Sequence, residues 1–149
     1  MKEAKDIVFI KNTLEVLKQY EQFKGELRQS YARTLFINAC IGLLFIPRSS
    51  SIYDKLPDEI VSKKKWGIDA DDIKICTPNR TVNQVARHLR NSIGHNRFEY
   101  DCPLCASKPI EEISFKDLSS KNNITFQATL KFKDFSNFVL KIANFAVEN

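Results

Sequence analysis

The chain has 149 residues, a formal net charge of +5, and hydrophobic and charged fractions of 43% and 28%. This length supports one core of ordinary size, so we expect a single domain over residues 1–149, and the composition excludes a disordered chain. The N-terminal segment mixes charges into its apolar residues, unlike a signal peptide, and the longest apolar run ends at Pro47 before it could cross a bilayer. We therefore expect a cytoplasmic protein with no membrane segment.

The first half of the chain has the spacing of two long helices. Apolar residues recur every three or four positions over residues 7–20 and, after an interruption at Gly25, again over residues 27–42. Towards its end the second segment is apolar on nearly every side, which is typical of a helix buried inside a bundle.

Residues 47–72 are predicted to be mostly loop. Serines, prolines and mixed charges indicate irregular structure, with a short helix from Pro57. The KKKW sequence at residues 63–66 combines basic residues with an aromatic ring, as some nucleic-acid contacts do. We interpret it instead as a solvated lysine run beside a buried Trp66.

A third helix is predicted after the CTPNRT sequence at residues 76–81. Asn79 or Thr81 can cap it, and apolar residues over 82–93 form one stripe that ends near Gly94. Three polar residues follow one another at i, i+4 intervals on the face opposite this stripe: Arg87, Asn91 and His95.

The periodicity changes in the last third of the chain. Residues 110–115 and 124–132 flank a turn-rich SSKNN sequence, and the second segment alternates apolar and polar residues, which predicts a two-stranded hairpin packed against the helices. Asp134 is expected to cap a last helix that runs to Val147. The predicted fold is therefore mainly α: a helical bundle with a small antiparallel β-hairpin inserted before the C-terminal helix.

Two other motifs are weaker signals. TVNQVARHL, residues 81–89, resembles the first half of a helix-turn-helix, but the apolar stripe continues where the turn should come. Cys102 and Cys105 have the spacing of half a zinc site, which would need His88, His95 or a second chain to complete it. A zinc-stabilised domain stays an alternative. We expect free thiols, no bound metal and no cofactor.

The most informative segment is free of acidic residues. Between Ile73 and Phe98 there is no aspartate or glutamate, whereas five cations occur: Lys74, Arg80, Arg87, Arg90 and Arg97. Such a concentration of positive charge favours an anionic partner. The RNSIGH sequence, residues 90–95, lies within this segment at the end of the third predicted helix.

RNSIGH resembles the R-x(4–6)-H motif of the HEPN superfamily, in which a polar residue, often asparagine, follows the arginine. The TLFINACIGLLFIP run at residues 34–47 and the NNITFQATLKFKDFSNFVLKIANFA run at 122–146 look like a prokaryotic HEPN nuclease subfamily with the same hairpin insertion. Several HEPN toxins carry a tyrosine two residues after the histidine, where this chain has Arg97. That departure puts tyrosine-dependent chemistry in doubt but leaves the Arg–His pair intact.

The resemblance implies a helical bundle that acts as a metal-independent endoribonuclease in toxin–antitoxin or phage-defence systems. It also implies a homodimer with the motif at its interface, RNA as substrate, and an antitoxin protein as a further partner. A HEPN module without catalytic activity, which binds RNA, nucleotide or a protein partner, is the alternative.

The residues suggest how such an enzyme would work. Cleavage by the 2′-hydroxyl needs a base, an acid and cations for the developing charge. We assign proton transfer to His95, phosphate binding to Arg90 and positioning to Asn91. Five residues along a helix place the arginine and the histidine about 7.5 Å and 140° apart, so a two-fold dimer is needed to bring both to one ester. Additional RNA contacts are expected from three neighbouring residues: Arg87, His88 and Arg97.

Overall fold

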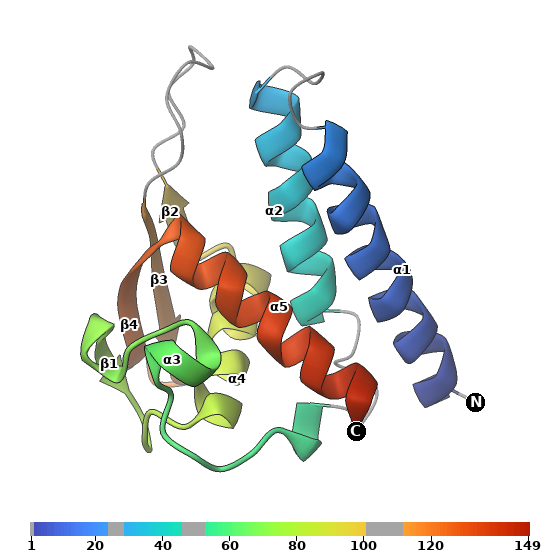
Figure 1. The fold of residues 1–149 in the computed structure, drawn as a ribbon. Coiled ribbons are helices and arrows are strands. Elements are labelled where there is room, and N and C mark those ends of the chain that lie inside the picture. Colours follow the sequence, from blue (N-terminus) through green and yellow to red (C-terminus); the bar gives the residue numbers. More distant parts are fainter. Residues whose placement is uncertain (1, 24–28, 46–52, 101–111) are drawn as a thin grey trace.

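A computed structural model describes residues 2–23, 29–45, 53–100 and 112–149 (Figure 1). The helices in these ranges are α1 (Lys2–Phe23), α2 (Gln29–Phe45), α3 (Lys63–Trp66), α4 (Val82–Gly94) and α5 (Phe132–Glu148), with single 3-10 turns at Tyr53–Lys55 and Ala70–Asp72. The strands are β1 (Ile73–Cys76), β2 (Phe98–Tyr100), β3 (Glu112–Leu118) and β4 (Ile124–Lys131).

The strands form one antiparallel sheet in the order β1-β4-β3-β2. Its centre is the β3–β4 hairpin, in which Ile113 lies opposite Leu130 and Phe115 opposite Ala128. These four side chains are buried, and the alternate residues of β3 are exposed, so the sheet has one buried face and one open face.

Helices α4 and α5 cover the buried face of the sheet, and α1 and α2 lie beside them as an antiparallel pair (Figure 1). α5 is the centre of the core because it contacts the sheet on one side and α1 and α2 on the other. Its fully buried stripe recurs at helical spacing and consists of Phe135, Phe138, Val139 and Ile142.

The predicted mainly α fold class is wrong, because the molecule is mixed α/β with a four-stranded sheet. The hairpin itself was predicted, but β1 and β2 extend it on both sides. These strands have four and three residues, too few for a period-two pattern to stand out, and each is formed by pairing with a segment distant in sequence.

Of the other local predictions, some are confirmed and some are wrong. The four long helices are confirmed, and α4 ends at Gly94 as expected. The short helix expected from Pro57 begins instead at Lys63, within the KKKW sequence. Trp66 is buried there beside exposed lysines, which confirms the interpretation of that sequence. Asp134 is not the cap of α5, since Lys131 occupies that position. None of the described helices is both long and apolar enough to cross a bilayer.

Candidate functional site

The C-terminal end of α4 is closed by a Schellman motif. Asn96 adopts a left-handed conformation with φ +54°, which asparagine tolerates better than most residues. Its N–H donates to Ile93 O at 3.0 Å, and the Arg97 N–H donates to Ser92 O at 2.7 Å. The chain therefore turns sharply after His95, and the position of this histidine is set by the backbone on both sides.

His95 is exposed at the C-cap position of α4. Its N–H donates to Asn91 O at 3.0 Å, so the last helical turn continues through it and places both residues on one side of the helix. Arg90 is half-buried. Five helical positions still separate Arg90 from His95, so the two side chains leave one chain in different directions.

His88, by contrast, lies inside the protein. Its side chain is 2% exposed, and its Nδ1 and Nε2 atoms lie 2.8 Å from Asp117 Oδ2 and 2.8 Å from Thr77 O, respectively. The ring stacks on Phe126 with a centroid separation of 5.2 Å and an interplanar angle of 8°. His88 was expected to contact RNA, but both of its ring nitrogens and one ring face already contact other residues of the protein.

The contacts of the His88 ring decide the role of its Nε2 atom. A carbonyl oxygen can only accept, so Nε2 carries a hydrogen and donates it to Thr77 O. The Arg87 Nη2 atom, 3.5 Å from the same nitrogen, is a donor as well and makes no competing bond. At Nδ1 the ring lies 2.8 Å from Asp117 Oδ2, so a hydrogen bond joins the imidazole to the carboxyl group.

Asp117 is the residue of this region that the sequence reasoning missed. Its carboxyl group is hydrogen-bonded to three nitrogens: His88 Nδ1 at 2.8 Å, Asn91 Nδ2 at 3.2 Å and the Leu118 N–H at 3.0 Å. Asp117 is 4% exposed on the buried face of β3. A signal was present, because Asp117 has the same strand parity as the apolar Ile113 and therefore points toward the helices.

The other basic residues of the acid-free segment lie in different places in the structure. Arg87 is exposed and donates to Gln84 Oε1 at 2.6 Å. Arg97 accepts the Lys116 N–H at 3.0 Å and so continues the β2–β3 ladder. By strand alternation, its side chain shares the open face of the sheet with Lys116 rather than the face covered by α4.

Arg80 has a structural contact at the edge strand. Its Nε and Nη2 atoms donate to Ile73 O at 3.0 Å and Lys74 O at 3.2 Å. Nearby, the Cys76 thiol donates to Asn79 O at 2.9 Å. Burial raises the pKa of Cys76 to about 11, although the Arg80 and Arg87 cations lower it in part. The thiol is therefore protonated at neutral pH.

The predicted zinc half-site lies outside the described residues, since Cys102 and Cys105 fall in the 101–111 gap. Over the described ranges, no three histidine, cysteine, aspartate or glutamate residues are grouped so as to hold a metal ion. His88 is engaged by Asp117 and Thr77, and His95 stands at the helix end.

A match to a protein-family model over the whole chain shows that the protein is a member of the HEPN superfamily. Within it, the chain belongs to the family described as HEPN pEK499 p136, whose model matches residues 1–149. This assignment confirms the resemblance seen in RNSIGH. No curated protein and no solved structure matches the chain.

Proposed function

We propose that the protein is a metal-independent endoribonuclease whose site is completed by a second copy of the chain. The 2′-hydroxyl of RNA attacks the adjacent phosphorus and loses its proton to a base. The bond from phosphorus to the 5′-oxygen breaks, and an acid protonates that oxygen. The products are a 2′,3′-cyclic phosphate and a 5′-hydroxyl, and the proton count balances without a metal.

The burial of His88 is the observation that carries the dimeric form of this proposal. The chain has two histidines. One is 2% exposed and hydrogen-bonded at both ring nitrogens, so His95 is the imidazole that RNA can reach. Cleavage needs a base and an acid at once. Two copies related by a two-fold axis would supply one His95 each.

The neighbouring residues take supporting roles in the proposed site. Arg90 binds the scissile phosphate and stabilises the negative charge that develops there, since its guanidinium offers several fixed donors. Asn91 lies one turn before His95 and is held by Asp117 at 3.2 Å, so its amide is positioned before RNA arrives. Arg87 of α4 and Arg97, which lies between α4 and β2, contact the RNA backbone.

Membership of the HEPN superfamily also supports a biological setting. We propose a toxin or phage-defence effector that acts on cytoplasmic RNA and is neutralised by an antitoxin protein. Growth arrest on expression of the wild-type chain, relieved by Arg90→Ala or His95→Ala, is the expected result in cells.

The direct test is RNA cleavage by the purified protein in EDTA. The wild type should cut a labelled RNA and leave an otherwise identical strand with a 2′-deoxy cleavage site intact. Arg90→Ala and His95→Ala should each reduce the rate at least about 100-fold, as expected for a proton carrier or a transition-state donor. Lys11→Ala, an exposed change on α1, is the matched control and should cut normally.

A mixing experiment tests the shared site. Wild-type chains refolded with a threefold excess of His95→Ala chains form wild-type dimers in only about 6% of cases, because pairing is random in a two-fold dimer. Activity should then fall as the square of the wild-type fraction. A linear fall to about a quarter, or a strictly monomeric wild type by light scattering, would contradict the two-copy site. An intact dimer that leaves RNA uncut would favour the non-catalytic alternative.

A further inference from the structure

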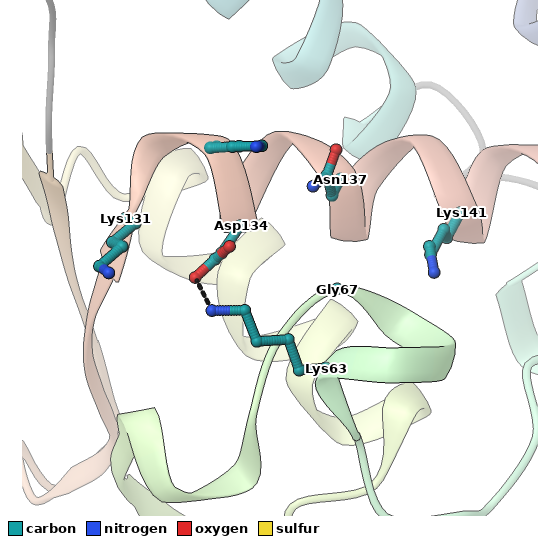
Figure 2. Close-up of a pocket in the computed structure, with 7 residues that line it drawn as sticks. Lys63, Gly67, Lys131, Asp134, Asn137 and Lys141 are labelled. Carbon is teal, nitrogen blue, oxygen red and sulfur yellow. Dashed lines mark hydrogen bonds and ion pairs between the residues drawn. The ribbon is translucent and has the colours of Figure 1, made fainter.

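A second charged region lies where α3 meets the N-terminal end of α5 (Figure 2). It is an open pocket of about 440 Å³. Four lysines from three elements line it: Lys63 of α3, Lys131 at the end of β4, and Lys133 and Lys141 of α5. Asp134 is the acidic residue among the described residues of its wall, so the lining carries a net charge of four minus one, or +3.

The negative charge of Asp134 is already paired with one of these lysines. Asp134 is 6% exposed, and its Oδ2 atom lies 3.2 Å from Lys63 Nζ. Figure 2 marks this ion pair with a dashed line. At the other end of the pocket, Lys141 Nζ donates to Lys64 O at 3.2 Å and Lys65 O at 3.0 Å, which holds α3 against α5. These contacts fix two of the lysines and leave the surplus positive charge in place.

The other two lysines supply two of the three surplus positive charges. The ammonium groups of Lys131 and Lys133 make no hydrogen bond or ion pair with any residue that the structure describes. Glu112 lies opposite Lys131 in the strand register but is exposed to solvent. The first turn of the 17-residue α5 lies at the same place and adds the partial positive charge of its free N–H groups.

The pocket is formed by close backbone packing. Gly67 ends α3 with φ +86°, and a Cβ atom there would lie 2.9 Å from Asn137 Cβ and 3.1 Å from the Phe138 nitrogen. Such an approach is open only to glycine. The α3 lysine is therefore set against α5 by main chain rather than by a mobile side chain.

We propose that this pocket binds adjacent phosphate groups, as found along a single-stranded nucleic-acid backbone or in a free oligophosphate. Lysines bind phosphate as point charges, and the pocket is large enough for more than one phosphate group. No aromatic side chain lines it within the described residues, so bases are not stacked there and sequence is not read. This proposal does not depend on the ribonuclease proposal.

Binding is measured with two probes and the full-length protein. One is a fluorescent 2′-O-methyl oligonucleotide, which resists cleavage by 2′-hydroxyl attack, and the other is inorganic tripolyphosphate. Lys131→Ala/Lys133→Ala should weaken binding of at least one probe about tenfold or more. Its matched control, Lys5→Ala/Lys11→Ala on α1, removes the same charge from exposed positions elsewhere and should change binding less than about twofold.

Salt dependence and charge reversal sharpen the test. For the oligonucleotide, losing two phosphate contacts should reduce the slope of log K against log salt by about 1.4. Asp134→Asn removes the acid of the pocket and should tighten binding if the variant keeps its melting temperature. If the pocket variant loses only oligonucleotide binding, the ligand is a nucleic-acid backbone. If it loses only tripolyphosphate binding, the ligand is a free oligophosphate, and loss of both shows that the pocket binds the phosphate groups that the two share. The proposal is overturned if the pocket variant binds both probes as the control variant does.

Discussion

Two charged regions of this molecule differ in how their charges are placed. Beside α4, His88 and Asp117 are almost fully buried, and each polar atom of the pair meets a partner. Between α3 and α5, lysines surround an open pocket and outnumber the acid. Polar groups that are buried and hydrogen-bonded determine how the chain packs, whereas an exposed surplus of charge of one sign is available to a ligand.

The buried pair also helps to hold the helix that carries the RNSIGH motif. Asp117 links the hairpin to α4 through two residues of the same helix face, His88 and Asn91. The proposed RNA site at His95 therefore lies on a helix that is oriented by buried hydrogen bonds to Asp117. Among the described residues, the open pocket has a smaller set of contacts, which are one ion pair and bonds to main-chain carbonyls.

The largest expected effect comes from breaking the buried pair. Asp117→Ala should lower the free energy of unfolding by about 2–4 kcal/mol, because the buried His88 Nδ1 atom and two further nitrogens lose their hydrogen-bond partner. Urea denaturation measures the change. Lys116→Ala, next to it in β3 but on the open face, should differ from the wild type by less than about 0.5 kcal/mol. Equal stability of the two variants would mean that the pair has no structural role.

A change of intermediate size tests the frame of the open pocket. Gly67→Ala should cost about 1–3 kcal/mol, because alanine at φ +86° is strained and its Cβ meets the backbone of α5. It should also weaken phosphate binding at the pocket. Gly42→Ala in α2, where the added Cβ would lie 3.4 Å from the Phe9 ring, should be neutral or stabilising. Thermal melts of both variants decide the comparison.

The smallest effect concerns the Cys76 thiol near the buried pair. Its pKa is raised from 9.0 to about 11, so the neutral form is favoured in the folded state. That contribution to stability is present below pH 9 and is lost as the pH rises through about 11. At pH 7.5, iodoacetamide should label Cys76 about 100-fold more slowly in the native than in the unfolded protein, since the thiolate is the reactive form.

Labelling is followed by mass spectrometry in a Cys102→Ser/Cys105→Ser background. Cys40 gives an internal comparison, because burial raises its pKa further, to about 12. The native rate at Cys76 should rise about tenfold for each pH unit up to about 11. Labelling of native Cys76 at the unfolded rate would show that water enters this region freely.

Long periodic segments made most of the fold predictable. α1, α2, α4 and α5 and the β3–β4 hairpin all bury one face, so their apolar spacing is visible in the sequence. β1 and β2 were missed because a segment of three or four residues becomes a strand by pairing with a distant part of the chain. Such pairing leaves no pattern in the local sequence. The added pairing turned an expected α bundle into a mixed structure.

The candidate site was predictable at the helix end and not beneath it. His95, Asn91 and Arg90 could be placed by helix geometry and by the HEPN resemblance. His88 was assigned to the surface as a basic residue, although it lies three positions after Val85 and four before Ser92, both of which are buried. The lysine pocket had no local signature, because residues 63 and 131–141 meet only in the folded chain.

The reversal at Asn96 has a consequence for which changes the motif can accept. Upstream, the register of α4 is tied to β3 through Asn91, and downstream the Arg97 carbonyl is tied to β3 through the Lys116 N–H. A residue inserted between these two hydrogen bonds would rotate His95 by about 100° around the helix axis, or would shift the register of β2 against β3. The interval can therefore vary by substitution, but an insertion or deletion would misplace the imidazole.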